Sequence, residues 1–561
     1  MRARAALMIL AAALVPTMLG SPAWAHGGTY VAPENGGGGT PAPPPPAAGG
    51  GTPDPTVTGE SVSWREWWYY HRARYLELQA TLDAHRTVTP SRRLDVTWRD
   101  RAITALIAAL DDPNIDTSTG AAVALGKASA VQAVPALRRL LASQRADRTL
   151  REASALALGL IARPEGRTAL EKVLFDAGEA RRLRAFAAIG LGLTRSVSVV
   201  PNLVRVASAK RVDSEIRAAA YVALGIVGDD IVTPFLADAA RGRGARLGLL
   251  ERAAATDALG RIGDRDAIPV LVELIGDSKR EVRRGAILSL GRLARADDAA
   301  AVRALATAAT SEVELLARAY AAIALGRTGA RAGAATLHGL LDDPRIDLRG
   351  FAAIGLGILG RECDDEALRE KVATFLRRAI ESRRLSGDRR ASIAVALGIL
   401  KDRESVGAIG RIVVSKDTAE LRGHAAVALG MIGDRAALPV IRQALDGERD
   451  PALLRDLALA AGLLGDSEAI RMLVDLLKSN KSQYQRGNIA LALGRVGGPT
   501  AANAMVTLLE SERSFRRTRA MAAVALGHLL DDRPMPALFT IVEDFDYRLR
   551  CEAFVELIRI L

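Results

Sequence analysis

Histidine and acidic side chains are the residues of this sequence that could bind a metal ion or move protons in catalysis. Six histidines are present, and none is followed by glutamate. They are His26, His71, His85, His338, His424 and His528. A metal site needs several ligands around one point, whereas the last three histidines fall in three different units of a repeat. The sequence also contains no Gly-x-Ser-x-Gly, phosphate loop or Cys-x-x-Cys pair. We therefore expect no catalytic residues, no metal and no cofactor.

The elements that would position any site form a repeat, marked by the phrase x-Ala-Leu-Gly. The phrase returns thirteen times between Gly126 and Gly527, usually every 31 to 35 residues, with one step of 41 between Gly357 and Gly398. Self-similarity at this period is typical of stacked repeat units. The long step is consistent either with a binding insertion or with a lengthened helix that has no role.

Each unit is predicted to be a helical hairpin whose second helix carries the phrase. Taking the phrase glycine as position 0, position −2 is always Ala, Gly or Ser, and position −1 is Leu in twelve of the thirteen units. Glycine inside a helix costs about 1 kcal/mol relative to alanine, so its recurrence indicates that neighbouring helices approach closely there. Glycine at position +3 suits the left-handed residue that ends a helix. The predicted fold is all-α, an α-solenoid of about thirteen two-helix repeats in a superhelical stack.

The N-terminal region divides by composition. Residues 1–25 resemble a secretory signal peptide cleaved after Ala25, so we expect a secreted or periplasmic protein. Residues 26–60 are a Gly- and Pro-rich linker that cannot bury enough apolar surface to fold. Residues 61–100 are expected to form an aromatic-rich N-terminal capping region, and residues 101–561 the solenoid. No stretch after the signal is long and apolar enough for a transmembrane helix.

Tryptophans are concentrated in the expected cap. Trp64, Trp67 and Trp68 are spaced as one stripe of a helix. Such a stripe could cover the open end of the first repeat, as terminal units of solenoids require. The alternative is an exposed helix that binds a partner or a membrane interface.

The consensus Asp-x-x-Val-Arg-x-x-Ala-x-x-Ala-Leu-Gly-x-x-Gly-Asp resembles the HEAT repeat, in its short phycobilisome-lyase-like form. The resemblance covers about residues 101–561. It implies that the arginine at position −8, present in eleven units, joins an acidic residue in a ladder between successive units. The residues expected to form this structural ladder include Arg217, Arg283, Arg349 and Arg422.

The resemblance also implies that the second helices line the concave side of the solenoid. Positions −6 and +1 lie on one face of these helices and vary between units, so they are candidates for recognition or else half-buried contacts between units. Position −6 includes Phe186, Tyr320, Phe351, His424, Asp456, Asn488 and Met521. The partner-binding candidates are Tyr320, Phe351, Arg261, Arg292 and Arg327, together with Trp64, Trp67 and Trp68.

These observations favour an exported, non-catalytic scaffold that binds a protein through its concave face. Three classes of HEAT-like enzyme are the alternatives to that function. A di-iron hydroxylase needs His-Glu pairs, which this sequence lacks, and a DNA glycosylase needs access to nucleic acid, which export denies. A lyase-like enzyme or maturation factor remains the alternative. The net charge of +12 attracts anions without specifying one, so an acidic protein partner and contact with a membrane surface both stay open.

Overall fold

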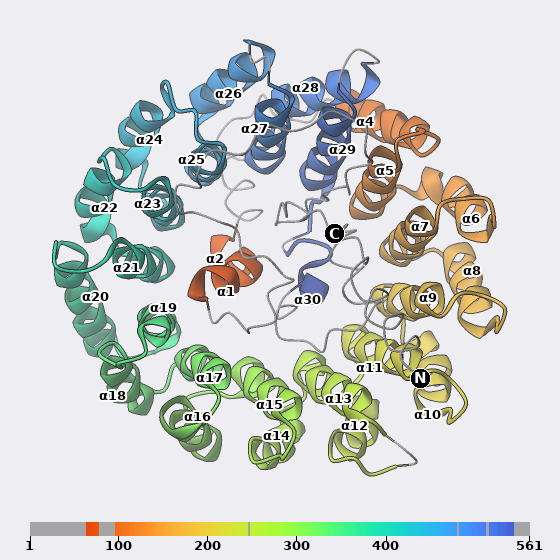
Figure 1. Cartoon of the computed structure of the whole chain (residues 1–561), viewed down its shortest axis with the longest axis horizontal. Coiled ribbons are helices and arrows are strands. Elements are labelled where there is room, and N and C mark those ends of the chain that lie inside the picture. Colours follow the sequence, from red (N-terminus) through yellow and green to blue (C-terminus); the bar gives the residue numbers. More distant parts are fainter. Residues whose placement is uncertain are drawn as a thin grey trace, which may run out of the picture.

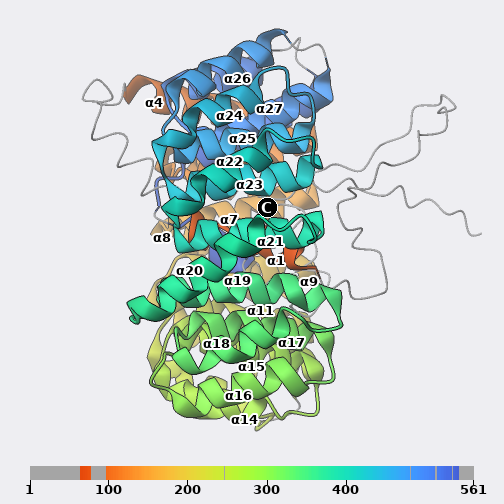
Figure 2. The ribbon, with the colours of Figure 1, turned by 90° about the vertical axis from the view of Figure 1, so that its left-hand side faces the viewer.

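The protein folds into a closed ring of helical hairpins (Figure 1). The computed structural model describes residues 63–77, 96–244, 247–479, 482–511, 515–533 and 535–542. Each repeat contributes an outer helix followed by an inner helix. Figure 2 shows that these helices run roughly parallel to the axis of the ring. The expected signal peptide (1–25) and linker (26–60) lie outside the described residues.

The helices alternate regularly between the two layers of the wall. The outer helices are α4 Val96–Ala109, α6 Val134–Ala142, α8 Pro164–Phe175, α10 Val200–Ser208, α12 Thr233–Ala240, α14 Ile268–Leu274, α16 Ala299–Ser311, α18 Arg331–Leu340, α20 Glu366–Ile380, α22 Val406–Val413, α24 Leu438–Leu445, α26 Ser467–Ser479 and α28 Pro499–Glu510. The inner helices are α5 Ile115–Lys127, α7 Arg148–Ile161, α9 Arg181–Leu193, α11 Ser214–Val227, α13 Leu249–Ile262, α15 Arg280–Leu293, α17 Leu315–Arg327, α19 Ile346–Glu362, α21 Gly387–Leu400, α23 Ala419–Ile432, α25 Pro451–Leu463, α27 Gln483–Val496 and α29 Arg516–Leu530. Inside the ring lie α1 Trp64–His71, α2 Ala73–Leu76 and α30 Phe539–Val542.

Each of the thirteen described units is a helical hairpin, as predicted, and the all-α solenoid is confirmed. Two features differ from the expectation. The stack does not end, because inner helix α29 packs on α5 and outer helix α28 packs on α4. The N-terminal aromatic segment therefore does not cover the first repeat: the last repeat occupies that place, and α1 packs on α19 instead. The first repeat begins with α4 at Val96, slightly before the predicted boundary at residue 101.

Close contact between consecutive inner helices is confirmed by the space around the phrase glycines. A Cβ added to Gly192 would lie 2.8 Å from the Cα of Ala223, at position −2 of the next unit. The same relation recurs at the ring closure, where a Cβ on Gly527 would lie 3.0 Å from the Cα of Ala124. Only a residue without a side chain lets the two backbones approach this closely. The closure thus uses the same contact as the interfaces within the chain.

Helix ends also follow the sequence. Gly228, Gly263 and Gly433, all at position +3, have φ angles of 78°, 87° and 76°, the left-handed conformation that glycine adopts without strain. The carboxylate of Asp213 accepts from the amide of Glu215 at the start of α11. The long step between Gly357 and Gly398 is taken up by α19, with 17 residues, and α20, with 15. It is therefore a lengthened hairpin.

Polar contacts lock the closure. Arg519, at position −8 of the last unit, pairs with Asp112 of the first unit at 2.5 Å. Arg533 donates to the carbonyl oxygen of Lys127 at 3.0 Å and to the hydroxyl of Ser129 at 2.9 Å. It also reaches the carbonyl oxygen of Leu160 in the second unit, at 3.3 Å. One side chain thus clips the last unit across the first and onto the second.

Replacing Gly192 with alanine should destabilise the ring by about 1–3 kcal/mol, because the new methyl group would have to displace the backbone of Ala223. The midpoint of urea or thermal unfolding measures the effect. The matched control is Gly339→Ala in α18, where an added Cβ meets nothing within 4 Å. That substitution should be neutral or stabilise by about 0.5–1 kcal/mol. Equal destabilisation by both variants would contradict the close-contact role.

Replacing Arg533 with alanine should loosen the closure selectively. Loss of hydrogen bonds from a charged donor costs roughly 1.5–3 kcal/mol, so amide hydrogen exchange in α5 and α29 should speed up roughly tenfold or more, with α13 and α15 unchanged. The control is Arg265→Ala, since Arg265 makes a similar clip to Leu293 and Asp298 within the chain. It should affect α13, α15 and their neighbours instead. Equal acceleration of amide exchange throughout the ring in both variants would show that the closure does not open separately from the rest of the ring.

Candidate functional site

The strongest candidate site lies inside the ring, where the helix pair α1–α2 contacts a surface that we call the inner wall. The wall is built from one sector of inner helices, α17 to α25 (Figure 1). The residues of the inner wall that contact the helix pair are Arg327, Gly350, Phe351, Arg361, Asp388, Lys401, Glu420, His424 and Asp456.

Trp64 anchors the first turn of the pair. Its indole Nε1 donates to the carboxylate of Asp388 at 2.8 Å, and its ring lies 5.1 Å from the ring of His424. The indole edge fills the space above Gly350, where an added Cβ would lie only 2.2 Å from Trp64 Cδ1. Glycine at this position of α19 therefore forms a notch that admits an indole.

Trp67 forms the centre of the contact and is fully buried. Its ring stacks on His71 at 4.5 Å and meets Phe351 of the wall edge-on at 6.5 Å. The guanidinium of Arg327 lies 6.0 Å from the Trp67 ring centre, within the range of a cation–π attraction. Trp68, also buried, stacks on Tyr75 at 6.0 Å within the helix pair.

Ion pairs fix both ends of the helix pair. At the N-terminal end, Arg65 contacts Asp388 at 2.7 Å and Glu420 at 2.6 Å. At the C-terminal end, Glu77 pairs with Arg361 and, at 2.8 Å, with Lys401. Burial disfavours the charge of Glu77, but the hydrogen bonds from Lys401 and Arg361 outweigh it and hold the pKa of Glu77 below its usual range.

The middle of the pair places a cation in a buried position. Burial, with a further contribution from nearby Arg495, lowers the pKa of Arg72 to about 10. Its counter-ion Asp456 lies 3.8 Å away. Burial also lowers the pKa of neighbouring His424, against the attraction of Asp456. The imidazole beside Trp64 is therefore held in its neutral form at pH 7.

The predicted partner-binding residues divide into two groups. Phe351 and Arg327 contact the helix pair, and Tyr320 and Phe351 are 0% exposed. Arg261 and Arg292 instead bind the carboxylate of Asp257, at 2.7 and 3.1 Å. Burial opposes the charge on Asp257, but the two arginines hold the pKa of this carboxyl below its usual range. Tyr320 and Phe351 are thus buried in the wall, and Arg261 and Arg292 are engaged by Asp257.

The arginines at position −8 lie where the resemblance predicted. Arg217 reaches Glu251 at 2.5 Å, and Arg283 and Arg422 reach Glu312 and Glu448 at 3.2 Å, each in the next unit. Arg349 instead donates to the backbone oxygen of Asp343 at 2.8 Å.

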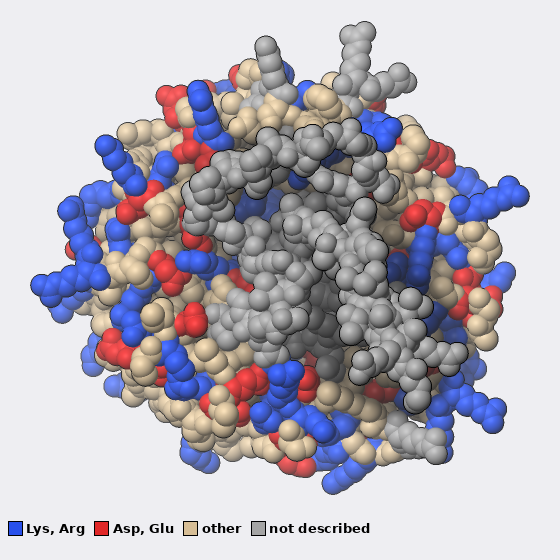
Figure 3. Space-filling view, viewed as in Figure 1, with Lys and Arg blue, Asp and Glu red and all other residues tan. Residues whose placement is uncertain are grey.

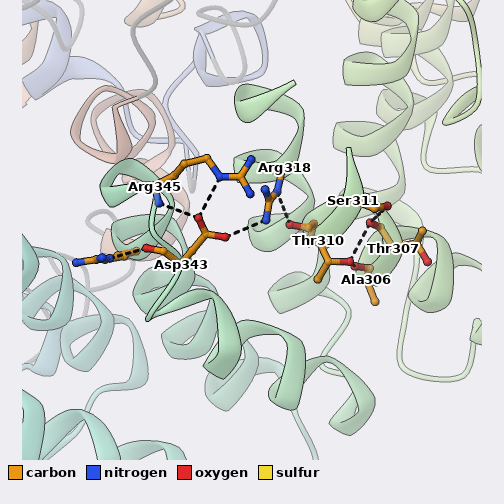
Figure 4. A network of polar contacts seen from close by, with 9 residues as sticks. Ala306, Thr307, Thr310, Ser311, Arg318, Asp343 and Arg345 are labelled. Carbon is orange, nitrogen blue, oxygen red and sulfur yellow. Dashed lines mark hydrogen bonds and ion pairs between the residues drawn. The ribbon is translucent and has the colours of Figure 1, made fainter. Parts of the chain in front are cut away.

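Figure 4 shows one rung of this ladder in detail. Arg318 binds the carbonyl oxygen of Ala309 at 2.9 Å within its own unit and the carboxylate of Asp343 in the next unit at 3.0 Å, while Arg345 holds the other oxygen of Asp343. Arg318 thus joins its own hairpin to the following one.

Several contact residues were not anticipated from the sequence. Asp388 and Glu420 occupy position −10, which is acidic in several units. Acidic residues are common in the first turn of any helix because they stabilise its N-terminus, so this signal was hidden. The positions that vary between units were more informative: Phe351, His424 and Asp456, all at position −6, contact the helix pair.

Other kinds of site are not apparent in the part of the chain that the structure describes. There, no three His, Cys, Asp or Glu side chains converge as metal ligands, and no helix has the length and apolar character of a membrane span. Figure 3 shows Lys and Arg spread around the ring on the face in view, interspersed with Asp and Glu. The positive charge on this face is therefore distributed.

Comparisons with known proteins address the repeat. The family model of HEAT repeats matches residues 174–246, 250–317 and 438–523, and the model of the PBS lyase HEAT-like repeat matches residues 421–447. No curated protein matches the sequence.

Solved structures match the chain at low identity and low TM-score. Human deoxyhypusine hydroxylase in complex with glycerol is 21% identical, with 54% of this chain and 96% of that chain covered and a TM-score of 0.24. Kap95p with RanGDP is 14% identical, with 77% and 66% covered and a TM-score of 0.35. YibA of E. coli is 18% identical, with 49% and 94% covered and a TM-score of 0.29. Identities and TM-scores this low indicate nothing about the activity or partners of this chain.

The assignment of the family thus rests on the matched repeats and on the hairpins themselves. The matched segments span helices from both sides of the ring, and the hairpins between them follow the same glycine and arginine pattern. The chain contains HEAT repeats, and residues 421–447, which run from α23 into α24, match the PBS lyase-like form of the repeat.

Proposed function

We propose that this protein is an exported, non-catalytic scaffold that binds another protein through the concave face of its repeats. The observation that carries the proposal is the inner wall, which holds a helix through buried tryptophans and ion pairs. Tryptophan, tyrosine and arginine dominate the binding energy of protein interfaces. A surface that already binds a helix of its own chain in this way has the chemistry to bind a helix of another protein.

Export is proposed from the sequence of residues 1–25, and the absence of catalysis from the lack of a recognisable catalytic set in the sequence. The charged residues of the inner wall support the second point, because they face oppositely charged residues of the helix pair. Such pairing serves binding rather than proton transfer. The alternative is a lyase-like enzyme or maturation factor, which the match of residues 421–447 to the PBS lyase HEAT-like repeat favours.

Affinity capture tests this proposal. The mature chain, beginning at His26, is used as bait in the envelope fraction of its source and should retain a protein partner in a fixed ratio. The control bait carries Asp388→Lys and Glu420→Lys, which reverse the charge of the inner wall, and should lose that partner at least about tenfold. Native mass spectrometry of the purified chain should give the mass of the polypeptide alone.

Two outcomes would contradict the proposal. A bound chromophore, detected as absorbance in the visible range, would favour the lyase-like alternative. A partner retained equally by both baits would place binding on the outside or the edges of the ring rather than on the concave face.

A further inference from the structure

The helix pair α1–α2 behaves chemically as a ligand of the ring rather than as part of it. The ring closes through α4, α5, α28 and α29, and its units are joined by glycine contacts and arginine rungs in which α1 and α2 take no part. The pair is held to the inner wall by side chains, chiefly Trp64, Trp67, Arg65 and Glu77. Its removal would leave these inter-unit contacts in place.

The inner wall presents a definite pattern of charge to whatever occupies it. Carboxylates of Asp388, Glu420 and Asp456 face the arginines of the helix pair. At the other end, Arg361 and Lys401 face a carboxylate. These charges attract an oppositely charged helix and favour its binding in the matching orientation. The wall therefore selects a helix with arginine near its start and an acidic residue after its end.

The wall also selects aromatic side chains at fixed spacing. The notch at Gly350 receives one indole, and Phe351 with Arg327 receives a second, one helical turn further on. Residues three apart lie on the same side of a helix. A tryptophan at i and another at i+3, with arginine at i+1, thus describe the occupant.

The resident helix does not satisfy all of its own polar groups. Among the described residues, neither Nε1 of fully buried Trp67 nor one Nη of Arg72 has a hydrogen-bond partner. Each buried donor left in this state weakens the contact. Burial also disfavours the charge of Arg72. An occupant with better-matched groups could therefore displace the pair.

We infer that the inner wall is a recognition site for a helical segment of another protein carrying Trp-Arg-x-Trp on one face and an acidic residue beyond its C-terminal end, and that α1–α2 occupies this site as a tethered competitor. The inference rests on the proposed scaffold function and specifies its partner. A partner helix replaces the pair rather than adding to it.

Tethering sets the size of the expected effect. A site on the same chain sees its tethered ligand at an effective concentration of about 1 mM. If the resident pair binds the wall with an intrinsic Kd of about 1 µM, a free helix would bind the occupied wall about a thousandfold more weakly than the empty wall. Releasing the tethered pair should therefore uncover tight binding in trans.

The experiment uses the full chain and a fluorescent peptide with the sequence of residues 62–78 as the probe. Wild-type protein should bind the peptide weakly. Arg65→Glu places a carboxylate against Asp388 and Glu420 and should release the pair, so the peptide should bind this variant at least about 100-fold more tightly by fluorescence anisotropy. Trp64→Ala with Trp67→Ala removes both indoles from the resident helix and should give the same gain by an independent route.

Two controls tie binding to the wall. A peptide with both tryptophans replaced by alanine should not bind any variant. A chain that combines Arg65→Glu with Asp388→Arg and Glu420→Arg should recapture its own helix and repel the wild-type peptide, which returns binding to the weak level. Circular dichroism and the elution volume verify that each variant keeps its helices and its ring.

Equal affinity of the peptide for the wild type and for both release variants would overturn the inference, as would no binding to folded release variants. Either result leaves the scaffold proposal standing if the captured partner is still lost from the bait with Asp388→Lys and Glu420→Lys, since the inner wall would then bind a segment of different sequence. Loss of partner capture, together with tight peptide binding to the release variants, would contradict the scaffold proposal and support the inference. The two proposals therefore fail separately.

Discussion

The close contact between consecutive inner helices is the constraint on which the rest of this structure depends. A glycine faces a small residue of the next unit, so the two backbones nearly touch, as at Gly192 and Ala223. The outer helices have no such relation and are spaced more widely around the circumference (Figure 1). Each unit is consequently a wedge, narrow inside and broad outside. Thirteen similar wedges complete one turn, and the last meets the first through the same contact.

Closure changes what the N-terminal aromatic segment has to do. In an open solenoid the terminal units expose apolar faces and need a cover. Here the final repeat provides it, through the approach of Gly527 to Ala124 and the pairing of Arg519 with Asp112. The tryptophans are therefore released from the capping role and bury themselves against the concave face instead. Closure of the ring thus accounts both for the missing cap and for the position of the helix pair inside the ring.

Much of the fold follows from individual residues. The hairpins, the close approach at the phrase glycines and the helix ends at Gly228 and Gly263 were predictable, because each depends on interactions within one unit or between neighbours. The arginine rungs were implied by the resemblance to the HEAT repeat. Closure was not predictable in this way, because it depends on the sum of small rotations over the whole chain. The same local contacts would be present in an open superhelix of slightly lower curvature.

The candidate site was predictable in part. Positions that vary between units identified Phe351 and Arg327, since residues not needed for stacking are free to differ. Their contact with Trp67 could not be read from the sequence, because an indole fits many apolar surfaces. Asp388 and Glu420 were hidden among acidic residues that favour helix starts. Arg261 and Arg292 showed the converse, since they share Asp257 and stabilise the wall itself.

The last consequence concerns how such a protein can change over evolutionary time. Open repeat arrays lengthen or shorten readily, because a duplicated or deleted module adds or removes only one junction. A circle has no such freedom: a fourteenth wedge of the same angle would overlap its neighbours, and a missing one would leave a gap. Copy number here is fixed by curvature, so diversification must proceed by substitution at single positions rather than by gain or loss of whole modules.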